Sequence, residues 1–130
     1  MKRVFLSFIA EDKDHANGVR LLASNPNNAL EFYDESVSVP YNSTEAHYIK
    51  SRIRDKIRRS SVTVCLISEN THRSEWVDWE LDESDSLGNT IIAMAVKGVE
   101  RAVLPKLIKR KGLTFYPWDT NNLAKLINEA

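Results

Sequence analysis

The feature that most constrains the fold is a regular alternation of short apolar runs with longer amphipathic stretches. The apolar runs are rich in β-branched and aromatic residues, which favours buried strands. Between them, apolar residues recur at helical spacing, as do Ile49, Ile53 and Ile57. Strands that alternate with helices are typical of a parallel sheet covered on both faces. The expected strands lie at residues 4–8, 30–34, 61–67, 90–96 and 113–116.

Five strands and their helices in a chain of 130 residues predict an α/β, flavodoxin-like three-layer sandwich with strand order 2-1-3-4-5. In such folds a ligand binds beyond the carboxyl ends of the strands, beside the switch point between strands 1 and 3. The loops at 7–11, 34–41 and 68–74 are therefore expected around any site. The expected helices are 12–23, one capped by Ser43 or Thr44 and ending near Arg59, one from the Ser74 cap to Leu87, a short one after Val99 interrupted at Pro105, and a last one capped by Thr120 or Asn121.

Composition limits the class of protein. A chain of 130 residues is long enough for one domain, and we expect a single domain over residues 1–130. Its 18 basic and 18 acidic residues cancel, whereas proteins that bind nucleic acid or anionic membrane usually show a basic excess. No apolar segment approaches a membrane span, and the run before Glu11 is too short for a signal peptide. We expect a cytoplasmic protein that binds neither nucleic acid nor membrane.

The residues that follow the strands exclude several kinds of site. Ile9 and Ala10 follow the first strand, where a phosphate-binding loop requires glycines, so no nucleotide-binding Gly-rich loop is present. The third strand ends without the Asp that would accept phosphate in a receiver domain. The three histidines lack metal-ligand spacing, so no metal site is expected. Cys65, the one cysteine, lies within an apolar strand and is predicted to be a buried thiol.

One carboxylate stands on the wrong side of its helix. When the residues from Ser74 onward are placed about 100° apart, Glu80 falls inside the apolar arc, one turn after Trp76. A carboxylate on a half-buried face needs donors that satisfy its charge. Two interpretations are open: Glu80 bonds a backbone amide, Lys or Arg at the core edge, or it lines a pocket and faces substrate hydroxyls or a developing cation. The predicted core face comprises Trp76, Val77, Leu81 and Leu87.

The segment around Glu80 also resembles a known family. Residues 74–81, Ser-x-Trp-Val-x-x-Glu-Leu, resemble the Ser-x-Trp-Cys-x-x-Glu-Leu segment of TIR domains, with Val77 in place of the usual Cys. Residues 4–8, 32–34 and 64–68 are similar to the first three strands of that family. The loop at 36–41 departs from the pattern because it lacks the Pro-Gly pair. The resemblance is closest to short prokaryotic TIR-like proteins, including the NAD-consuming sensors of Thoeris antiphage defence.

The resemblance implies an enzyme. In enzymatic TIR domains the helix Glu is catalytic, and Glu80 occupies that position. The implied reaction cleaves the N-glycosidic bond between nicotinamide and ribose in NAD, with NAD as substrate and no bound cofactor. Capture by water gives ADP-ribose, and internal capture gives a cyclic ADP-ribose-type signal read by a separate effector protein in antiviral defence. The residues expected to contact NAD are Ser7, Phe8, Ile9, Asp34 and Trp76.

Alternatives remain for the residues and for the whole chain. Trp76 is equally compatible with plain core packing, and Asp34 with capping a turn. A second functional class is a non-enzymatic TIR-like adaptor that acts by protein–protein assembly. The helix over 50–59 is basic and the helix over 75–85 is acidic, which indicates either two solvated faces or complementary surfaces that dock between subunits of a homo-oligomer.

Overall fold

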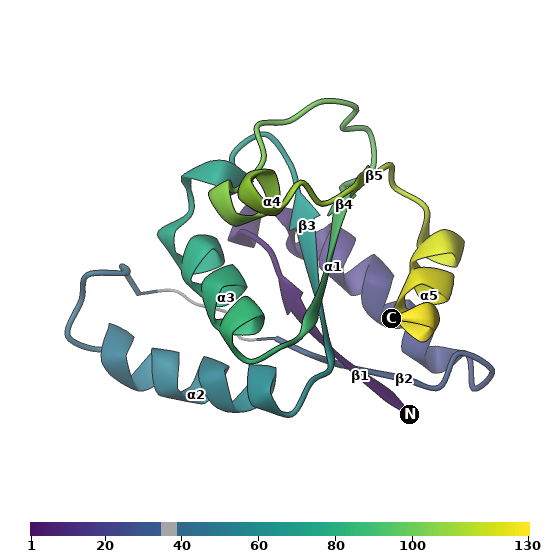
Figure 1. Cartoon of the computed structure of the whole chain (residues 1–130), viewed down its shortest axis with the longest axis horizontal. Helices are drawn as coiled ribbons and strands as arrows, with labels where there is room; N and C mark the ends of the chain where they lie inside the picture. Colours follow the sequence, from purple (N-terminus) through teal and green to yellow (C-terminus); the bar gives the residue numbers. More distant parts are fainter. Residues whose placement is uncertain (35–38) are drawn as a thin grey trace.

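The structure, a computed structural model, describes residues 1–34 and 39–130. Five parallel strands form one sheet of order β2-β1-β3-β4-β5, so the flavodoxin-like α/β fold and its strand order are confirmed (Figure 1). The strands are β1 (Lys2–Ser7), β2 (Leu30–Tyr33), β3 (Val62–Ile67), β4 (Thr90–Ala95) and β5 (Phe115–Tyr116), and the helices are α1 (Lys13–Arg20), α2 (Ala46–Arg58), α3 (Glu75–Ser86), α4 (Lys106–Lys111) and α5 (Thr120–Glu129).

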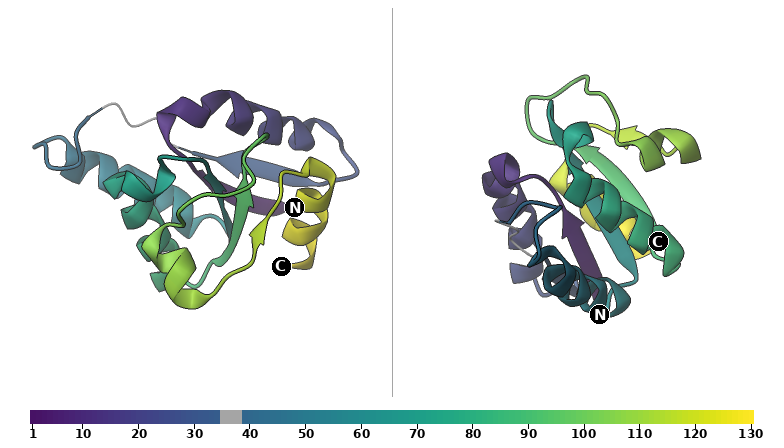
Figure 2. Two further views of the ribbon diagram at one scale, coloured as in Figure 1. Left: turned by 90° about the horizontal axis from the view of Figure 1, so that it is seen from above. Right: turned by 90° about the vertical axis from the view of Figure 1, so that its left-hand side faces the viewer.

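Helices cover both faces of the sheet. Figure 2 shows α1 and α5 on one face and α2, α3 and α4 on the other. Side chains of β1 alternate between them, because successive residues of a strand point to opposite faces. Leu6 packs in the core under α1 and α5, whereas Phe5 packs against α2. Ser7, two residues after Phe5, therefore faces the α2–α3 side at the carboxyl end of the strand.

The central strand β3 is buried along its whole length, as its nearly continuous apolar run predicts. It lies between β1 and β4, and Ser7 at the end of β1 is aligned with Cys65 of β3. Because the strands are parallel, the segments that follow β1 and β3 emerge at the same edge of the sheet. The predicted positions of the loops at 7–11 and 68–74 are thus confirmed, whereas the loop at 34–41 lies partly outside the described residues.

Two predicted helix caps are wrong. Helix α2 begins after Glu45, and the Ser43 hydroxyl donates instead to the Pro40 carbonyl at 2.7 Å. Helix α5 is capped by Asp119, whose carboxylate accepts a hydrogen bond from the Asn122 amide at 3.0 Å. In both cases several neighbouring residues could serve as the N-cap, and the geometry of the preceding turn determines which of them does.

The prediction between β4 and β5 is also wrong. No helix follows Val99 within the described residues before Pro105, and α4 begins directly after that proline. Proline suits the start of a helix, because its missing N–H has no intrahelical partner there. Leu87 was predicted on the core face of α3 but is 37% exposed, since it follows the last residue of the helix.

Candidate active site

Glu80 is buried with 4% of its surface exposed, as the helical pattern predicts. The Ser7 hydroxyl, itself fully buried at the end of β1, donates a hydrogen bond to Glu80 Oε1 at 2.7 Å. A hydroxyl donor stabilises the charged form of a carboxylate and partly offsets its desolvation. The bond also fixes the direction of the carboxylate against the carboxyl end of the sheet. Both residues were predicted site residues, but nothing in the sequence indicates that they contact each other.

The helix that carries Glu80 is itself firmly placed. Its first turn is closed by Ser74, whose Oγ accepts a hydrogen bond from the Val77 amide at 3.1 Å, so this predicted cap is confirmed. One turn after Glu80, the buried Ser84 hydroxyl donates to the Glu80 carbonyl at 2.8 Å and accepts from Thr63 Oγ1 at 2.7 Å. Thr63 belongs to β3, so these hydroxyls join the centre of α3 to the sheet.

A second buried polar cluster lies at the same edge of the sheet. Asp12, 6% exposed, accepts a hydrogen bond from the Ser68 hydroxyl at 2.5 Å. The Ser68 amide donates to Thr71 Oγ1 at 2.8 Å, which closes the turn after β3. These bonds join the segment after β1 to the segment after β3. No sequence pattern indicates this cluster, because each of its residues alone resembles an ordinary loop residue.

Trp76 connects α3 to the chain that follows the second strand. Its Nε1 donates to the Val39 carbonyl at 3.0 Å, and its ring lies edge-on to Tyr41 with centroids 5.2 Å apart. Lys50 Nζ lies 3.9 Å from the centre of the Tyr41 ring, a cation–π contact. The predicted loop 36–41 falls partly on residues outside the described ones, and Val39 to Tyr41 are the part whose contacts are known. Trp76 therefore packs against the core under α2, and the edge of its ring contacts this loop.

The predicted site residues divide between the two faces of the sheet. Ile9 packs with the core under α3 and α4, on the side of Glu80, whereas Phe8 packs with the core under α1 and α5. Phe8 lies beneath the Arg20 guanidinium, 5.9 Å from the ring centre, and Arg20 forms an ion pair with Asp34. Asp34 thus belongs with Phe8 on the α1 side, and no sequence signal singled out Arg20 as its partner.

The amino-acid sequence matches one family model, that of the Thoeris protein ThsB, TIR-like domain, over residues 5–101. The chain belongs to this family. The match spans β1 to β4 and includes Ser7, Asp34 and Glu80. Membership supports a role in TIR-type signalling. No curated protein significantly matches the sequence.

Solved structures with the same fold belong to several functional classes. The TIR domain of the Toll-related receptor TRR-2 from Hydra magnipapillata is 19% identical with a TM-score of 0.65, covering 96% of this chain and 97% of that one. A 2-deoxyribosyltransferase from Bacillus psychrosaccharolyticus is 17% identical with a TM-score of 0.65, covering 94% and 90%. The CMP N-glycosidase BcmB of Clostridium botulinum is 14% identical with a TM-score of 0.64, covering 98% and 99%. These likenesses show the fold.

The acidic and basic helices predicted from the sequence of this TIR-like protein form ion pairs with each other within the molecule. Acidic α3 lies between basic α2 and α4 (Figure 1). The Arg54 guanidinium of α2 contacts both carboxylate oxygens of Glu83 at 3.2 Å. On the other side, Lys106 of α4 lies 3.9 Å from Asp78, and Lys111 pairs with Asp85. The complementary charges of these three helices thus pair with one another within one subunit.

Cys65 is fully buried, as predicted, and burial raises the pKa of its thiol. Within the described residues no group of His, Cys, Asp or Glu could hold a metal ion. No helix in that part of the chain combines the length and the apolar character needed to cross a bilayer.

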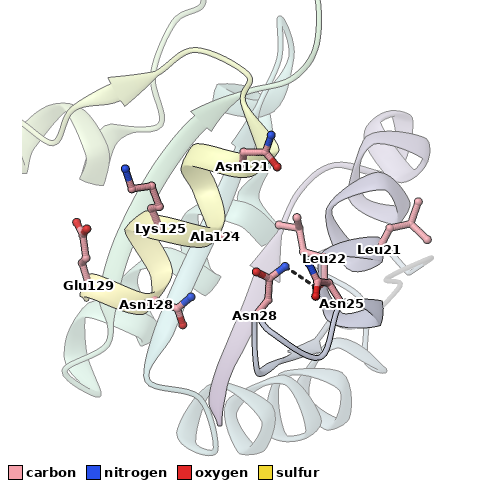
Figure 3. A pocket seen from close by; sticks show the side chains of 9 residues that line it. All are labelled: Leu21, Leu22, Asn25, Asn28, Asn121, Ala124, Lys125, Asn128 and Glu129. Carbon is pink, nitrogen blue, oxygen red and sulfur yellow. Dashed lines mark hydrogen bonds between the residues drawn. The ribbon is translucent and has the colours of Figure 1, made fainter.

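A cavity of about 380 Å³ lies between residues 21–28 and α5 (Figure 3). Asparagine side chains line it from both sides, and within the 21–28 wall Asn28 Nδ2 donates to the Leu22 carbonyl at 2.9 Å. Helix α5 covers the face of the sheet opposite α3, and the cavity shares no lining residue with the candidate active site. It is thus separate from Glu80.

Proposed function

We propose that this TIR-like protein cleaves NAD at the bond between nicotinamide and ribose, with Glu80 as the catalytic carboxylate. The observation that carries the proposal is the bond from Ser7 to Glu80, which holds a buried carboxylate at the carboxyl edge of the sheet in a chain of the ThsB TIR-like family. Ligands of open α/β sheets bind at that edge. Some TIR domains cleave NAD, and the family match includes the Glu80 position.

The chemistry of the bond suits a carboxylate that acts without a strong acid. Nicotinamide leaves with the electron pair of the C–N bond and becomes neutral, so its departure needs little protonation. The ribose C1′ becomes cationic, and a nearby carboxylate stabilises that charge and holds the ribose hydroxyls. Water that adds to C1′ and loses a proton gives ADP-ribose, whereas addition of an internal nucleophile gives a cyclic product. The product of either route is the proposed signal for a separate effector protein.

In this proposal the predicted site residues have different roles. Ser7 is a positioning residue, because its buried hydroxyl contacts Glu80. Ile9 and Trp76 lie on the same side of the sheet as Glu80 and are proposed to flank the substrate. Asp34, paired with Arg20 beside Phe8, is proposed to reach the ribose or amide groups of NAD from the other side of the edge.

Two structural neighbours are named for enzymes that act on nucleosides or nucleotides, the 2-deoxyribosyltransferase and the CMP N-glycosidase. Their likeness to this chain concerns the fold, and it indicates that the fold is compatible with chemistry at a glycosidic carbon. It also favours a second candidate, an N-glycosidase whose substrate is a mononucleotide. The adaptor hypothesis remains a third outcome, in which the TIR-like protein forms a stoichiometric complex and cleaves nothing.

The test is to incubate the purified protein with NAD, and separately with CMP, over a range of protein concentrations and to identify the products by mass. The proposal predicts free nicotinamide together with ADP-ribose or its cyclic isomer, and intact CMP. Release of cytosine from CMP with intact NAD would support the mononucleotide candidate. Intact substrates at every protein concentration would contradict an enzymatic role and favour the adaptor.

A further inference from the structure

A cavity of about 470 Å³ opens at the carboxyl edge of the sheet, the same edge that holds Glu80 and Ser7. The segment after β3 and the segment after β4 form its walls. Neither segment was assigned a function by the sequence, apart from the expectation that 68–74 lies near a site. The cavity is lined by Glu69, His72, Arg73, Arg101, Ala102 and Val103.

The arginines of this cavity differ from the paired cations of the helix layer. Arg54 is held by Glu83 and Lys106 by Asp78, whereas the side chains of Arg73 and Arg101 make no ion pair within the described residues. Both are exposed, so their guanidinium groups are available to a ligand. The two cations outnumber the single carboxylate of Glu69, which gives the cavity a positive character.

Two further features of the lining are consistent with a bound polar ligand. His72 Nδ1 is buried and has no hydrogen-bond partner within the described residues. Val103 is 61% exposed beside the arginines and offers an apolar surface on the wall of the cavity. Guanidinium groups bind phosphate oxygens in a bidentate manner, and an imidazole adds a further donor.

The distance between the cavity and Glu80 indicates which anionic group of a substrate the cavity would bind. Arg73 directly precedes the Ser74 cap of α3, and Glu80 lies five residues after Glu75, the first residue of that helix. At 1.5 Å per residue, Glu80 is about 8 Å along the helix axis from its start. In NAD the nicotinamide and the diphosphate are attached to the same ribose, at C1′ and at C5′. A substrate placed at Glu80 therefore needs a site for its diphosphate at a short distance along the same edge.

We propose that Arg73 and Arg101 bind the diphosphate of the dinucleotide substrate, with His72 as an additional donor. This inference rests on the proposed NAD cleavage. The arginines then act on substrate binding rather than on bond cleavage, because they contact a part of NAD that does not change in the reaction. They also set specificity, since a substrate without a diphosphate gains nothing from them.

The first test compares NAD with nicotinamide riboside, which has the same glycosidic bond and no phosphate. In the double variant Arg73→Ala/Arg101→Ala, the ratio of kcat/KM for NAD to that for nicotinamide riboside should fall about tenfold or more, mainly through KM for NAD. The matched control is Arg58→Ala/Arg110→Ala, which removes two exposed arginines outside the cavity and should leave the ratio unchanged. An unchanged ratio in the cavity variant, or equal losses for both substrates, would overturn the proposal.

The second test uses no catalysis and so separates this proposal from the proposed function. Inorganic pyrophosphate is titrated into the protein while backbone amide signals are followed by NMR. The proposal predicts shifts concentrated at residues 69–73 and 101–103, which are lost in the cavity variant and kept in the control. Absence of such shifts in the wild type overturns the site, even if NAD is cleaved. Shifts there in a protein that leaves NAD intact would support an anion site and contradict the proposed activity.

Discussion

The two sides of α3 hold their carboxylates in opposite ways. On the outer sides, Asp78, Glu83 and Asp85 pair with cations of the neighbouring helices at the protein surface. On the inner side, Glu80 is buried and bonded to a neutral hydroxyl. Surface pairs contribute little to stability, because water and salt screen them and long side chains lose freedom. A buried carboxylate is costly to fold, which is why the proposed catalytic role is assigned to Glu80 and not to the surface carboxylates.

The largest expected effect on stability is at the apolar residue beside Glu80. Leu81→Ala removes a fully buried side chain and leaves a cavity, so the free energy of unfolding should fall by about 2–5 kcal/mol. Asp82→Ala, one residue further on the exposed side, should change it by no more than about 0.5 kcal/mol. Urea unfolding of the two variants measures both values. Similar losses would contradict the description of α3 as a helix with one buried and one solvated side.

The next effect is expected at the hydroxyl that holds the buried carboxylate. Ser7→Ala removes a bond to a charged group, so the free energy of unfolding should fall by about 1.5–3 kcal/mol. If Ser7 positions Glu80, kcat for NAD should also fall, and Ser7→Thr, which keeps the hydroxyl, should retain more of it.

The control is Ser60→Ala, because the buried Ser60 hydroxyl donates to a neutral carbonyl, that of Lys56, at 2.9 Å. In this variant the free energy of unfolding should fall by about 1 kcal/mol, and kcat for NAD should not change. A Ser7→Ala protein with unaltered kcat would show that the hydroxyl is only structural.

A smaller effect is expected at the start of the same helix. Ser74→Ala removes the acceptor of the Val77 amide and should lower the free energy of unfolding by about 1 kcal/mol. Ser86→Ala, at the exposed last residue of α3, provides the comparison and should have almost no effect. Thermal unfolding of both variants separates the two positions, and equal melting temperatures would argue against Ser74 as the cap.

The smallest effect is expected at the surface ion pair between α2 and α3. A double-mutant cycle with Arg54→Ala and Glu83→Ala should give a coupling energy of about 0.2–1 kcal/mol, which weakens as salt is added. A coupling well above that range, and insensitive to salt, would mean that the outer side of α3 is as important to the fold as the inner side.

Most of the fold could be predicted because the strands are short apolar runs and the helices are amphipathic. The order of the strands and the burial of Glu80 both follow from that periodicity. Partners that come together only in three dimensions could not be predicted. The Ser7 hydroxyl reaches Glu80 from a residue 73 positions away, and the ion pair of Arg20 with Asp34 joins a helix to the end of a strand.

The exact ends of helices could not be predicted either, because neighbouring residues are equally suited to begin or end them. Ser43, Thr44 and Glu45 all compete to begin one helix, and the hydrogen bond from Ser43 to Pro40 decides the outcome. Likewise, the helical pattern continues through Leu87 although the helix ends at Ser86, so periodicity alone placed Leu87 in the core. Turn geometry fixes these details, and it is weakly encoded in residue type.

In the proposed reaction the buried carboxylate of α3 cleaves NAD, and its surface neighbours take no part. The most direct measurement is the rate of nicotinamide release by the wild type, by Glu80→Gln and by Glu83→Gln at equal protein concentration. Glu80→Gln keeps the shape of the side chain and an acceptor for Ser7, so it should stay folded and lose activity by about 100-fold or more. Glu83→Gln should retain the wild-type rate. A Glu80→Gln protein that releases nicotinamide as fast as the wild type would show that Glu80 is not the catalytic carboxylate.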